Sequence, residues 1–316
     1  MIKVVYSARY QIDIGLHVFP TEKYRLVAEQ LKIGTIEPEP ATWDQLALVH
    51  TPEYLEKLRT GRMETADLAQ LELPWSEQVV DGFRVMVGGT ILAARLAAQN
   101  QTQRSPSSPR KTNLASFANS AFNVVCHIGG GLHHAFPNHG EGFCPFNDVA
   151  VAVRVLQREG VARHAIVDLD VHHGNGTAFI FESAPDVFTF SMHQQHNYPM
   201  WKPKGSLDIG LPDGTHDATY LAALERALPE VLAHRPDCIF YLAGADPYED
   251  DQLGGLRLTK DGLRKRDRMV IQTARTAGIP LVITLAGGYA RRVQDTVEIH
   301  AATIDEAIRA ITASRE

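Results

Sequence analysis

Residues 165–177 read AIVDLDVHHGNGT, and this stretch indicates both the fold class and the place of the chemistry. It begins with Ala165–Leu169, a short apolar run typical of a parallel strand that is buried on both faces. It then changes to acidic, histidine and glycine residues. Asp168, Asp170 and His172 are spaced two apart, so on a strand their side chains project to the same face. The stretch therefore predicts a buried strand that runs into a polar site.

Similar apolar runs recur along the chain, and segments with helical periodicity separate them. The other expected strands are Ile2–Tyr6, Ala121–Cys126, Val187–Ser191, Cys238–Leu242 and Leu281–Leu285. The expected helices are Gln78–Ala98, Pro145–Arg158, Thr219–His234, Leu263–Ala277 and Val293–Ile311. This alternation predicts an α/β fold with a central, mostly parallel sheet and helices on both faces.

Glycines and functional side chains follow four of the expected strands at their C-terminal ends. They are Gly129–Gly131 with His133 and His134, Asp170 with His172 and His173, Gly244 with Asp246, and Gly287–Gly288 with Tyr289. Ligands of open α/β sheets bind at this edge, and glycine lets the backbone approach them closely. Ten of the 14 histidines also fall between residues 127 and 216. We therefore expect the chemistry in this window and at this edge.

Asp170, His172 and Asp246 are the candidate metal ligands. Two carboxylates and an imidazole at neighbouring strand ends would repel one another or stay unsatisfied without a cation. Three protein ligands leave a position open for water or substrate, which is typical of catalytic zinc. The same oxygen and nitrogen set would also accept Fe²⁺. The sequence thus predicts one catalytic Zn²⁺ or Fe²⁺ site.

Two further groups complete the expected chemistry. His133 and His134 follow a glycine-rich strand end at the same sheet edge, so we interpret them as acid/base groups. Tyr289 follows Gly287–Gly288 and is interpreted as a phenol that donates to a developing oxyanion.

Composition excludes several other classes of protein. The 316 residues are 44% hydrophobic and 22% charged, as in globular proteins, and the net charge of −6 argues against nucleic-acid binding. Three dispersed cysteines fit a reducing cytoplasm, and no apolar run is long enough to span a membrane. Residues 101–112 form one low-complexity stretch, expected to be an exposed loop within a single domain of residues 1–316.

At these residues the chain resembles the histone deacetylase family of the arginase/deacetylase fold. The resemblance rests on GGGLHHA (129–135), GFCPFND (142–148), DLDVHHGNGT (168–177), GAD (244–246) and GGY (287–289). Two early segments also fit, His17–Pro20 with Lys23–Tyr24 and Val49–Tyr54. The run LGGL (253–256), with Lys265-Arg266-Asp267 and GGYARR (287–292), is most similar to class IV enzymes and their bacterial relatives. The fold that this resemblance implies is a single domain with about eight strands.

The resemblance implies a role for each matching residue. Asp170, His172 and Asp246 would hold zinc, and Tyr289 would help to polarise the acyl carbonyl. His134 would take the proton from the attacking water and pass it to the amine. His133 would support it, held in turn by Asp168. Asn175 would contact His134, in a position where several deacetylase branches have aspartate. The implied tunnel residues are Gly142, Phe143 and Tyr198, and the implied structural K⁺ site is Asp168, Asp170, His172, Ser191 and Met192.

The function predicted in this way is removal of acyl groups, acetyl or longer, from the ε-amine of lysine in proteins or peptides. An amidohydrolase of acetylpolyamines or another small acyl-amine uses the same chemistry and stays open. A non-catalytic acyl-lysine reader is disfavoured because every inferred catalytic residue is present. A binuclear arginase-like centre would need carboxylates where the chain has Gly174 and Tyr248. Serine hydrolase chemistry lacks its G-x-S-x-G elbow.

Overall fold

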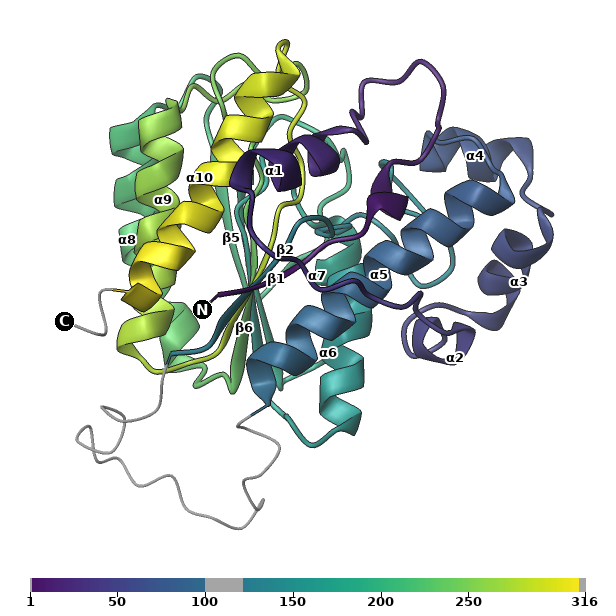
Figure 1. Cartoon of the computed structure of the whole chain (residues 1–316), viewed down its shortest axis with the longest axis horizontal. Helices are drawn as coiled ribbons and strands as arrows, with labels where there is room; N and C mark the ends of the chain where they lie inside the picture. The colour runs from purple at the N-terminus through teal and green to yellow at the C-terminus, as the bar shows by residue number, and fades with distance from the viewer. Residues whose placement is uncertain (1, 100–121, 313–316) are drawn as a thin grey trace.

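A single parallel sheet runs through the computed structural model, which describes residues 2–99 and 122–312. Seven strands pair within these residues in the order β1-β2-β7-β6-β3-β4-β5 (Figure 1). Their bounds are β1 Lys3–Val5, β2 Val124–His127, β3 His164–Asp168, β4 Val187–Gln194, β5 Leu207–Leu211, β6 Cys238–Leu242 and β7 Leu281–Thr284. Every neighbouring pair is parallel. The expected α/β class is confirmed, with seven strands here against about eight expected.

Helices cover both faces of the sheet, as the sequence predicted. In Figure 1, α8 (Asp217–Ala233), α9 (Lys260–Thr276) and α10 (Val293–Thr312) lie on one side, with α1 (Lys23–Leu31) beside α10. The other side carries α5 (Glu77–Ala98), α6 (Asp148–Arg158) and α7 (Asn175–Phe181). Three short helices extend beyond α5, namely α2 (Trp43–Leu46), α3 (Pro52–Thr60) and α4 (Thr65–Leu71). A 3₁₀ turn, η1 (Ala8–Tyr10), follows β1.

The helix boundaries are set by capping residues. The expected start at Pro145 is wrong by three residues, because α6 begins at Asp148 and Asn147 caps it by accepting a hydrogen bond from the Ala150 N–H. Thr259 caps α9 in the same way, which moves its start to Lys260 rather than the expected Leu263. Such caps satisfy N–H groups that have no partner inside the helix.

The elements that the sequence did not reveal are short or lie at an edge. No element was expected between residues 7 and 76, where η1 and α1–α4 have nine residues or fewer each and show too few turns for a period. β5 was also missed. It lies at the edge of the sheet, and only Leu211, its last residue, is buried, so it lacks the apolar character of the other strands.

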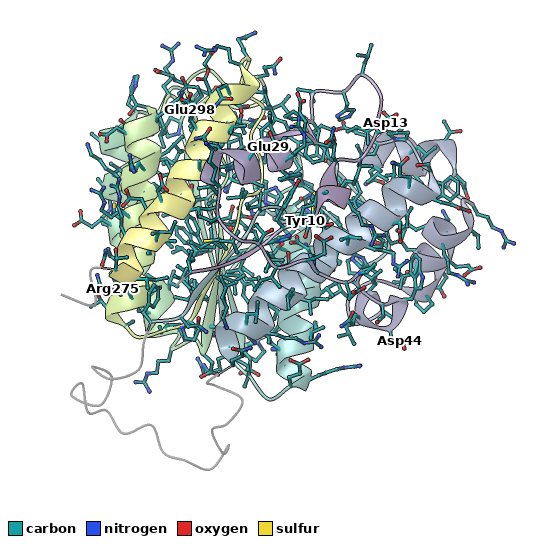
Figure 2. All side chains as sticks on the ribbon, in the orientation of Figure 1. Tyr10, Asp13, Glu29, Asp44, Arg275 and Glu298 are labelled. Carbon is teal, nitrogen blue, oxygen red and sulfur yellow. The ribbon has the colours of Figure 1, made fainter. Side chains whose placement is uncertain are left out.

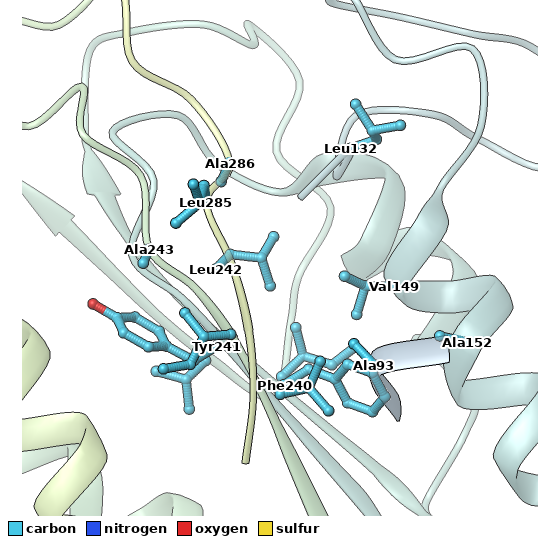
Figure 3. Close-up of a cluster of buried hydrophobic side chains, with 14 of the residues drawn as sticks. Ala93, Leu132, Val149, Ala152, Phe240, Tyr241, Leu242, Ala243, Leu285 and Ala286 are labelled. Carbon is cyan, nitrogen blue, oxygen red and sulfur yellow. The ribbon is translucent and has the colours of Figure 1, made fainter. Parts of the chain in front are cut away.

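The register of the sheet aligns the strand ends that carry the expected polar clusters. Asp168 at the end of β3 pairs with Leu242, Leu242 pairs with Thr284 of β7, and Thr284 pairs with His127 of β2. The segments that follow these four residues therefore leave the sheet along one line. Figure 3 shows the buried apolar layer beneath this line, where Leu242 and Ala243 lie close to Leu285 and Ala286.

Charged side chains lie mainly outside this framework. Figure 2 shows Asp44 and Glu298 at the periphery and Tyr10 within the molecule, where it is fully buried. Within the described ranges no helix is long and apolar enough to cross a membrane. The loop expected at residues 101–112 lies outside the described residues.

Candidate active site

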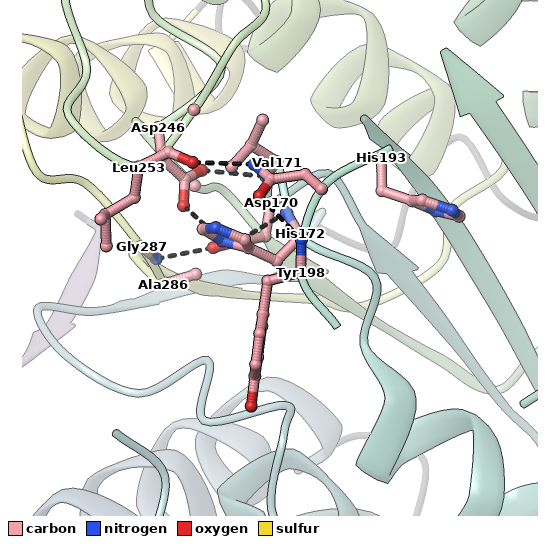
Figure 4. A network of polar contacts seen from close by, with 12 residues as sticks. Asp170, Val171, His172, His193, Tyr198, Asp246, Leu253, Ala286 and Gly287 are labelled. Carbon is pink, nitrogen blue, oxygen red and sulfur yellow. Dashed lines mark hydrogen bonds and ion pairs between the residues drawn. The ribbon is translucent and has the colours of Figure 1, made fainter. Parts of the chain in front are cut away.

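Asp170, His172 and Asp246 converge beyond the ends of β3 and β6, as their spacing predicted (Figure 4). Each is buried and offers one ligand atom, and these atoms lie within 4.8 Å of one another. The Nδ1 atom of His172 is 3.0 Å from Oδ1 of Asp170 and 3.5 Å from Oδ2 of Asp246. We call these three residues the ligand cluster.

Backbone N–H groups hold the two carboxylates of the ligand cluster in place. The N–H of Val171 donates to Oδ1 of Asp246 at 3.0 Å. The carboxylate of Asp170 accepts from the N–H groups of His172 at 3.0 Å and Gly287 at 2.9 Å. Because these donors belong to the segments after β3 and β7, the orientation of the carboxylates is fixed by the fold.

The ligand cluster fits a divalent cation. Oδ2 of Asp246 is buried and has no hydrogen-bond partner among the described residues. A Cβ atom at position 287 would lie 2.1 Å from this oxygen and 2.5 Å from Oδ2 of Asp170, so Gly287 leaves space in front of both carboxylates. Oxygen and imidazole ligands in this number suit Zn²⁺ or Fe²⁺.

The electrostatics of the ligand cluster also favour positive charge. Burial lowers the pKa of His172, but its contacts with Asp170 and Asp246 raise it to about 10. Burial and the charge of Asp170 raise the pKa of Asp246 to about 7. Without a metal ion, these shifts favour a bound proton within the ligand cluster. A metal ion that supplies the positive charge instead would have to displace that proton.

The tandem histidines occupy different environments beside the ligand cluster. Nδ1 of His133 is 2.7 Å from Oδ2 of Asp168, whereas Nδ1 of His134 is 2.7 Å from Oδ1 of Asn175. Burial lowers the pKa of His133, but the charges of Asp168 and Asp170 raise it to about 9. Burial and the neighbouring His133 hold the pKa of His134 well below its ordinary value. The surroundings therefore favour the charged form of His133 and the neutral form of His134.

Glu141 extends the contacts of His134 and was not expected from the sequence. Its Oε1 atom accepts hydrogen bonds from Nδ2 of Asn175 at 2.7 Å and from the hydroxyl of Tyr198 at 2.9 Å. The Asn175 amide therefore bridges a carboxylate and the His134 ring. Nothing in the sequence separated Glu141 from other acidic residues, since its partners lie 34 and 57 positions away.

Tyr289 lies on the segment after β7, which we call the tyrosine loop (residues 285–289). Its N–H donates to Oδ2 of Asp251 at 2.7 Å. Its ring packs edge-on against Phe19 and Phe143, with centroids 6.3 and 5.9 Å apart. Among the described residues its hydroxyl has no hydrogen-bond partner. Burial raises the pKa of Tyr289 well above its ordinary value, so the phenol keeps its proton.

Lys23 is a fully buried cation behind the tyrosine loop. Its Nζ atom donates to the carbonyl of Ala286 at 2.9 Å and lies 5.3 Å from the centre of the Tyr289 ring. Burial lowers the pKa of Lys23 to about 8, although nearby aspartates oppose this effect. Lys23 belongs to an early motif of the sequence, where no role was expected for it.

The segment that leads from β2 to the tandem histidines (residues 128–134) and the tyrosine loop are in direct contact. Gly131 has a φ of +79°, and a Cβ atom there would lie 2.5 Å from Cβ of Ala286. Only glycine fits this approach. A movement of one segment would therefore displace the other.

One pocket leads to these groups. Its wall contains the predicted tunnel residues Gly142 and Phe143. The residues that line it are Phe19, Tyr24, Gly130, Gly131, Leu132, His133, His134, Gly142, Phe143, Cys144, Asp170, His172, Ala286, Gly287 and Tyr289. Tyr198 is not part of this wall. It packs edge-on against His134, with ring centroids 5.0 Å apart.

The residues of the expected K⁺ site lie beside the ligand cluster. Asp168 of β3 pairs with Ser191 of β4, and Met192 follows Ser191. A small cavity is lined by Asp168 and Ser191 together with Thr177 and Ala178 of α7. A binuclear metal centre would need a second set of ligands. Within residues 2–99 and 122–312, Asp170, His172 and Asp246 form the one group with metal-binding geometry. Gly174 and Tyr248 supply no carboxylate for a second ion.

Comparisons with known proteins show what the chain is similar to. The profile of the Histone deacetylase domain matches residues 17–304. An uncharacterised protein of Picosynechococcus is 41% identical over 307 residues, which cover 94% of this chain and 95% of that protein. Histone deacetylase 2 of Arabidopsis thaliana is 30% identical over 324 residues, covering 94% and 78%. The crystal structure of an HDAC homologue complexed with SAHA superposes with a TM-score of 0.76 at 23% identity, covering 99% and 88%.

Proposed function

The chain belongs to the histone deacetylase family of hydrolases, and we propose that it is a zinc-dependent enzyme that removes acyl groups from the ε-amine of lysine in proteins or peptides. One observation carries the proposal. Asp170 and His172 of the ligand cluster, both tandem histidines and Tyr289 line one pocket, and Phe19 and Phe143 form part of its wall. Hydrolysis of a small acyl-amine such as an acetylpolyamine is the alternative.

The ligand cluster would hold the metal ion through Asp170, His172 and Asp246. When bound, Zn²⁺ polarises an acyl carbonyl and lowers the pKa of water. A structural K⁺ held by Asp168, Asp170, His172, Ser191 and Met192 is a further part of the proposal. The register of β3 and β4, which aligns Asp168 with Ser191, supports it.

His134 would be the general base and then the general acid. Its Nδ1 donates to Oδ1 of Asn175, so the lone pair is on Nε2, which would exchange its contact with His133 for the attacking water, take a proton from it and return that proton to the departing amine. Its lowered pKa keeps the ring neutral, as a base requires. The charged His133 ring, whose Nε2 lies 3.0 Å from Nε2 of His134, would stabilise negative charge that develops during the attack.

Tyr289 would donate a hydrogen bond from its hydroxyl to the carbonyl oxygen as that oxygen becomes negative. A donor of this kind contributes about 3 kcal/mol or more to stabilising a transition state. The Asp251 contact to its backbone and the packing of Phe19 and Phe143 orient the ring. These contacts leave the hydroxyl available to a substrate.

Aromatic walls would select an extended acyl-lysine. Phe19 and Phe143 stack with an interplanar angle of 11° and centroids 6.1 Å apart at the pocket. Such walls exclude water and pack along a hydrocarbon chain. Class IV-like motifs led us to expect activity on longer fatty-acyl groups, since each buried methylene contributes about 0.8 kcal/mol. Three buried cysteines without disulfides support the reducing cytoplasm as the proposed location.

A substrate panel with metal analysis of the same sample tests the proposal. The panel contains acetyl-, butyryl-, octanoyl- and myristoyl-lysine peptides together with acetylspermidine. We expect kcat/KM on the lysine peptides to exceed that on acetylspermidine and to rise with acyl length. A preference for acetylspermidine would favour the small-amine alternative. A steady fall from acetyl to myristoyl would contradict the expected chain-length preference alone, and hydrolysis of none of them would overturn the proposed activity.

A further inference from the structure

Arg266 is the largest side chain of the described residues that is entirely shielded from solvent, and the chemistry above does not use it. It lies in α9 within the Lys265-Arg266-Asp267 motif, for which the sequence suggested only a family branch. Moving a guanidinium out of water costs several kcal/mol unless its donors find good partners. The position of those partners therefore indicates what this residue is for.

One side of the guanidinium is paired with Asp267. Nε of Arg266 donates to Oδ1 of Asp267 at 2.9 Å, and Nη2 lies 2.8 Å from the same oxygen. The Asp267 carboxylate also accepts hydrogen bonds from the hydroxyls of Tyr241 at 2.5 Å and Thr303 at 2.7 Å. Since Tyr241 belongs to β6 and Thr303 to α10, the ion pair is fixed to the sheet and to a second helix.

The other side of the guanidinium reaches two backbone carbonyls at the active site. Nη1 donates to the carbonyl of Gly244 at 2.6 Å and, with a longer contact, to that of Leu169 at 3.4 Å. Leu169 directly precedes Asp170, and Gly244 stands two residues before Asp246. A single buried cation thus contacts both strand extensions that carry carboxylates of the ligand cluster.

These carbonyls lie at the point where pairing between the two strands ends. The ladder of β3 and β6 ends with Asp168 opposite Leu242, and the last bond between the extensions runs from the Leu169 N–H to the Leu242 carbonyl at 3.1 Å. Beyond it the backbone has no ladder to set the distance between Asp170 and Asp246. The Val171 N–H still reaches Oδ1 of Asp246 at 3.0 Å, and the Arg266 contacts connect the two backbone extensions at Gly244 and Leu169.

The wall between Arg266 and the ligand cluster is one residue thick. A Cβ atom at Gly244 would lie 2.7 Å from Oδ1 of Asp246 and 2.9 Å from Oδ2 of Asp170. The carbonyl of the same glycine accepts from Arg266. A displacement of this carbonyl would therefore be passed to both carboxylates.

We propose that Arg266 is a positioning residue of the metal centre, which holds the ends of β3 and β6 at the spacing where Asp170 and Asp246 share one cation. The inference rests on the ligand cluster of the proposed function, but not on its substrate. An ammonium group has one donor atom in place of the planar fork, so it cannot pair with Asp267 and the Gly244 carbonyl in the same geometry. Arg266→Lys therefore keeps the charge and removes the bridge.

The test measures metal binding rather than catalysis. Metal-free wild type, Arg266→Lys and the control Arg264→Lys are titrated with Zn²⁺ against a chromophoric chelator, and Tm is recorded with and without Zn²⁺. Arg264 is a matched control because it lies on the same helix but pairs with Glu306 near the surface. We expect Arg266→Lys to weaken zinc affinity by about 10- to 100-fold, the range for groups that orient metal ligands, and the control to leave it unchanged.

The difference in Tm between loaded and free protein separates positioning from simple packing. A residue that only packs in the core would lower both Tm values equally and leave zinc affinity within twofold of wild type, and that result would overturn the proposal. Loss of a positioning residue reduces the difference between the Tm values with and without Zn²⁺, because the stabilisation that a ligand gives depends on its affinity. The visible absorption spectrum of the Co²⁺-loaded Arg266→Lys protein should also differ from that of the Co²⁺-loaded wild type.

Asp267→Asn provides a second variant should Arg266→Lys fail to fold. It keeps the contacts of Arg266 with the Gly244 and Leu169 carbonyls but weakens its ion pair with residue 267. We therefore expect a loss of zinc affinity that is smaller than in Arg266→Lys. Unchanged zinc affinity in this variant would overturn the proposal. Wild-type protein that binds no Zn²⁺ would overturn the metal assignment itself. Failure to hydrolyse acyl-lysine leaves this test unaffected.

Discussion

The ligand cluster and the tyrosine loop lie side by side at one sheet edge, yet they are held in opposite ways. Every carboxylate of the ligand cluster is oriented by backbone N–H donors, and Arg266 supports it from behind. Tyr289 is fixed through its backbone and through ring packing, while its hydroxyl has no partner among the described residues.

The difference teaches what each region lacks. The ligand cluster has its geometry, but two carboxylates face one imidazole and Oδ2 of Asp246 has no hydrogen-bond partner among the described residues, so it lacks a cation. The tyrosine loop has no excess charge and lacks an acceptor for one phenol. A metal ion would satisfy the first, and the carbonyl oxygen of a substrate would satisfy the second. Variants should therefore separate metal binding from turnover.

The strongest test of this separation is Asp246→Ala. It leaves two metal ligands where a catalytic site needs three, so we expect loss of both bound metal and activity. Elemental analysis and turnover of the best panel substrate measure the two effects on one sample. We expect one zinc-class ion per wild-type chain. Two tightly held transition-metal ions per chain would contradict the single-ion assignment.

Tyr289→Phe should affect only the tyrosine loop. The ring and its packing remain, but the donor is removed, so kcat should fall about 100-fold or more. Metal content should stay at the wild-type value. A near-normal kcat would mean that the tyrosine serves packing alone and would remove the functional contrast between the two regions.

Lys23→Met is expected to have a smaller effect on the same loop. The carbonyl of Ala286 would lose its donor, and a net contribution of about 1 kcal/mol per hydrogen bond corresponds to a reduction in kcat of up to about tenfold. Zinc affinity should not fall, because the Lys23 charge acts on Asp170 and Asp246 and can only oppose a second cation there. Arg25→Met, an exposed change on the same helix, is the control. A loss of zinc affinity in Lys23→Met would show that the two regions are not independent.

Asn175→Asp should produce the smallest change, a shift in pH dependence. A carboxylate in place of the amide stabilises protonated His134, so the pKa of His134 should rise. The acidic limb of the kcat/KM profile reports the essential base of the free enzyme and should move to higher pH. Glu141 lies beside position 175, so Asn175→Asp with Glu141→Gln controls for repulsion between the two carboxylates. A limb that stays in place or moves down would mean that His134 is not the base.

The sequence predicted those parts of the site that depend on local spacing and on one rule of topology. Asp170 and His172 are two residues apart, and parallel strands bring Asp246 and Tyr289 to the same edge. Lys23, Glu141 and Arg266 could not be found in this way. Their partners are distant in sequence, as with Lys23 and Ala286, and many similar residues form ordinary surface ion pairs. Only the packing of helices against the strand ends distinguishes them.

The order of strands in the sheet also has a consequence for how the protein is made. β7 lies between β2 and β6 but is the last strand to be synthesised. A nascent chain that stops before Leu281 already carries the three metal ligands and both tandem histidines, but the strand that pairs with both β2 and β6 is missing. Two unpaired strand edges stay open meanwhile, and such edges invite association with other chains. The ribosome must therefore deliver the centre of this sheet last, and chaperones that shield exposed strands would matter most just before it does.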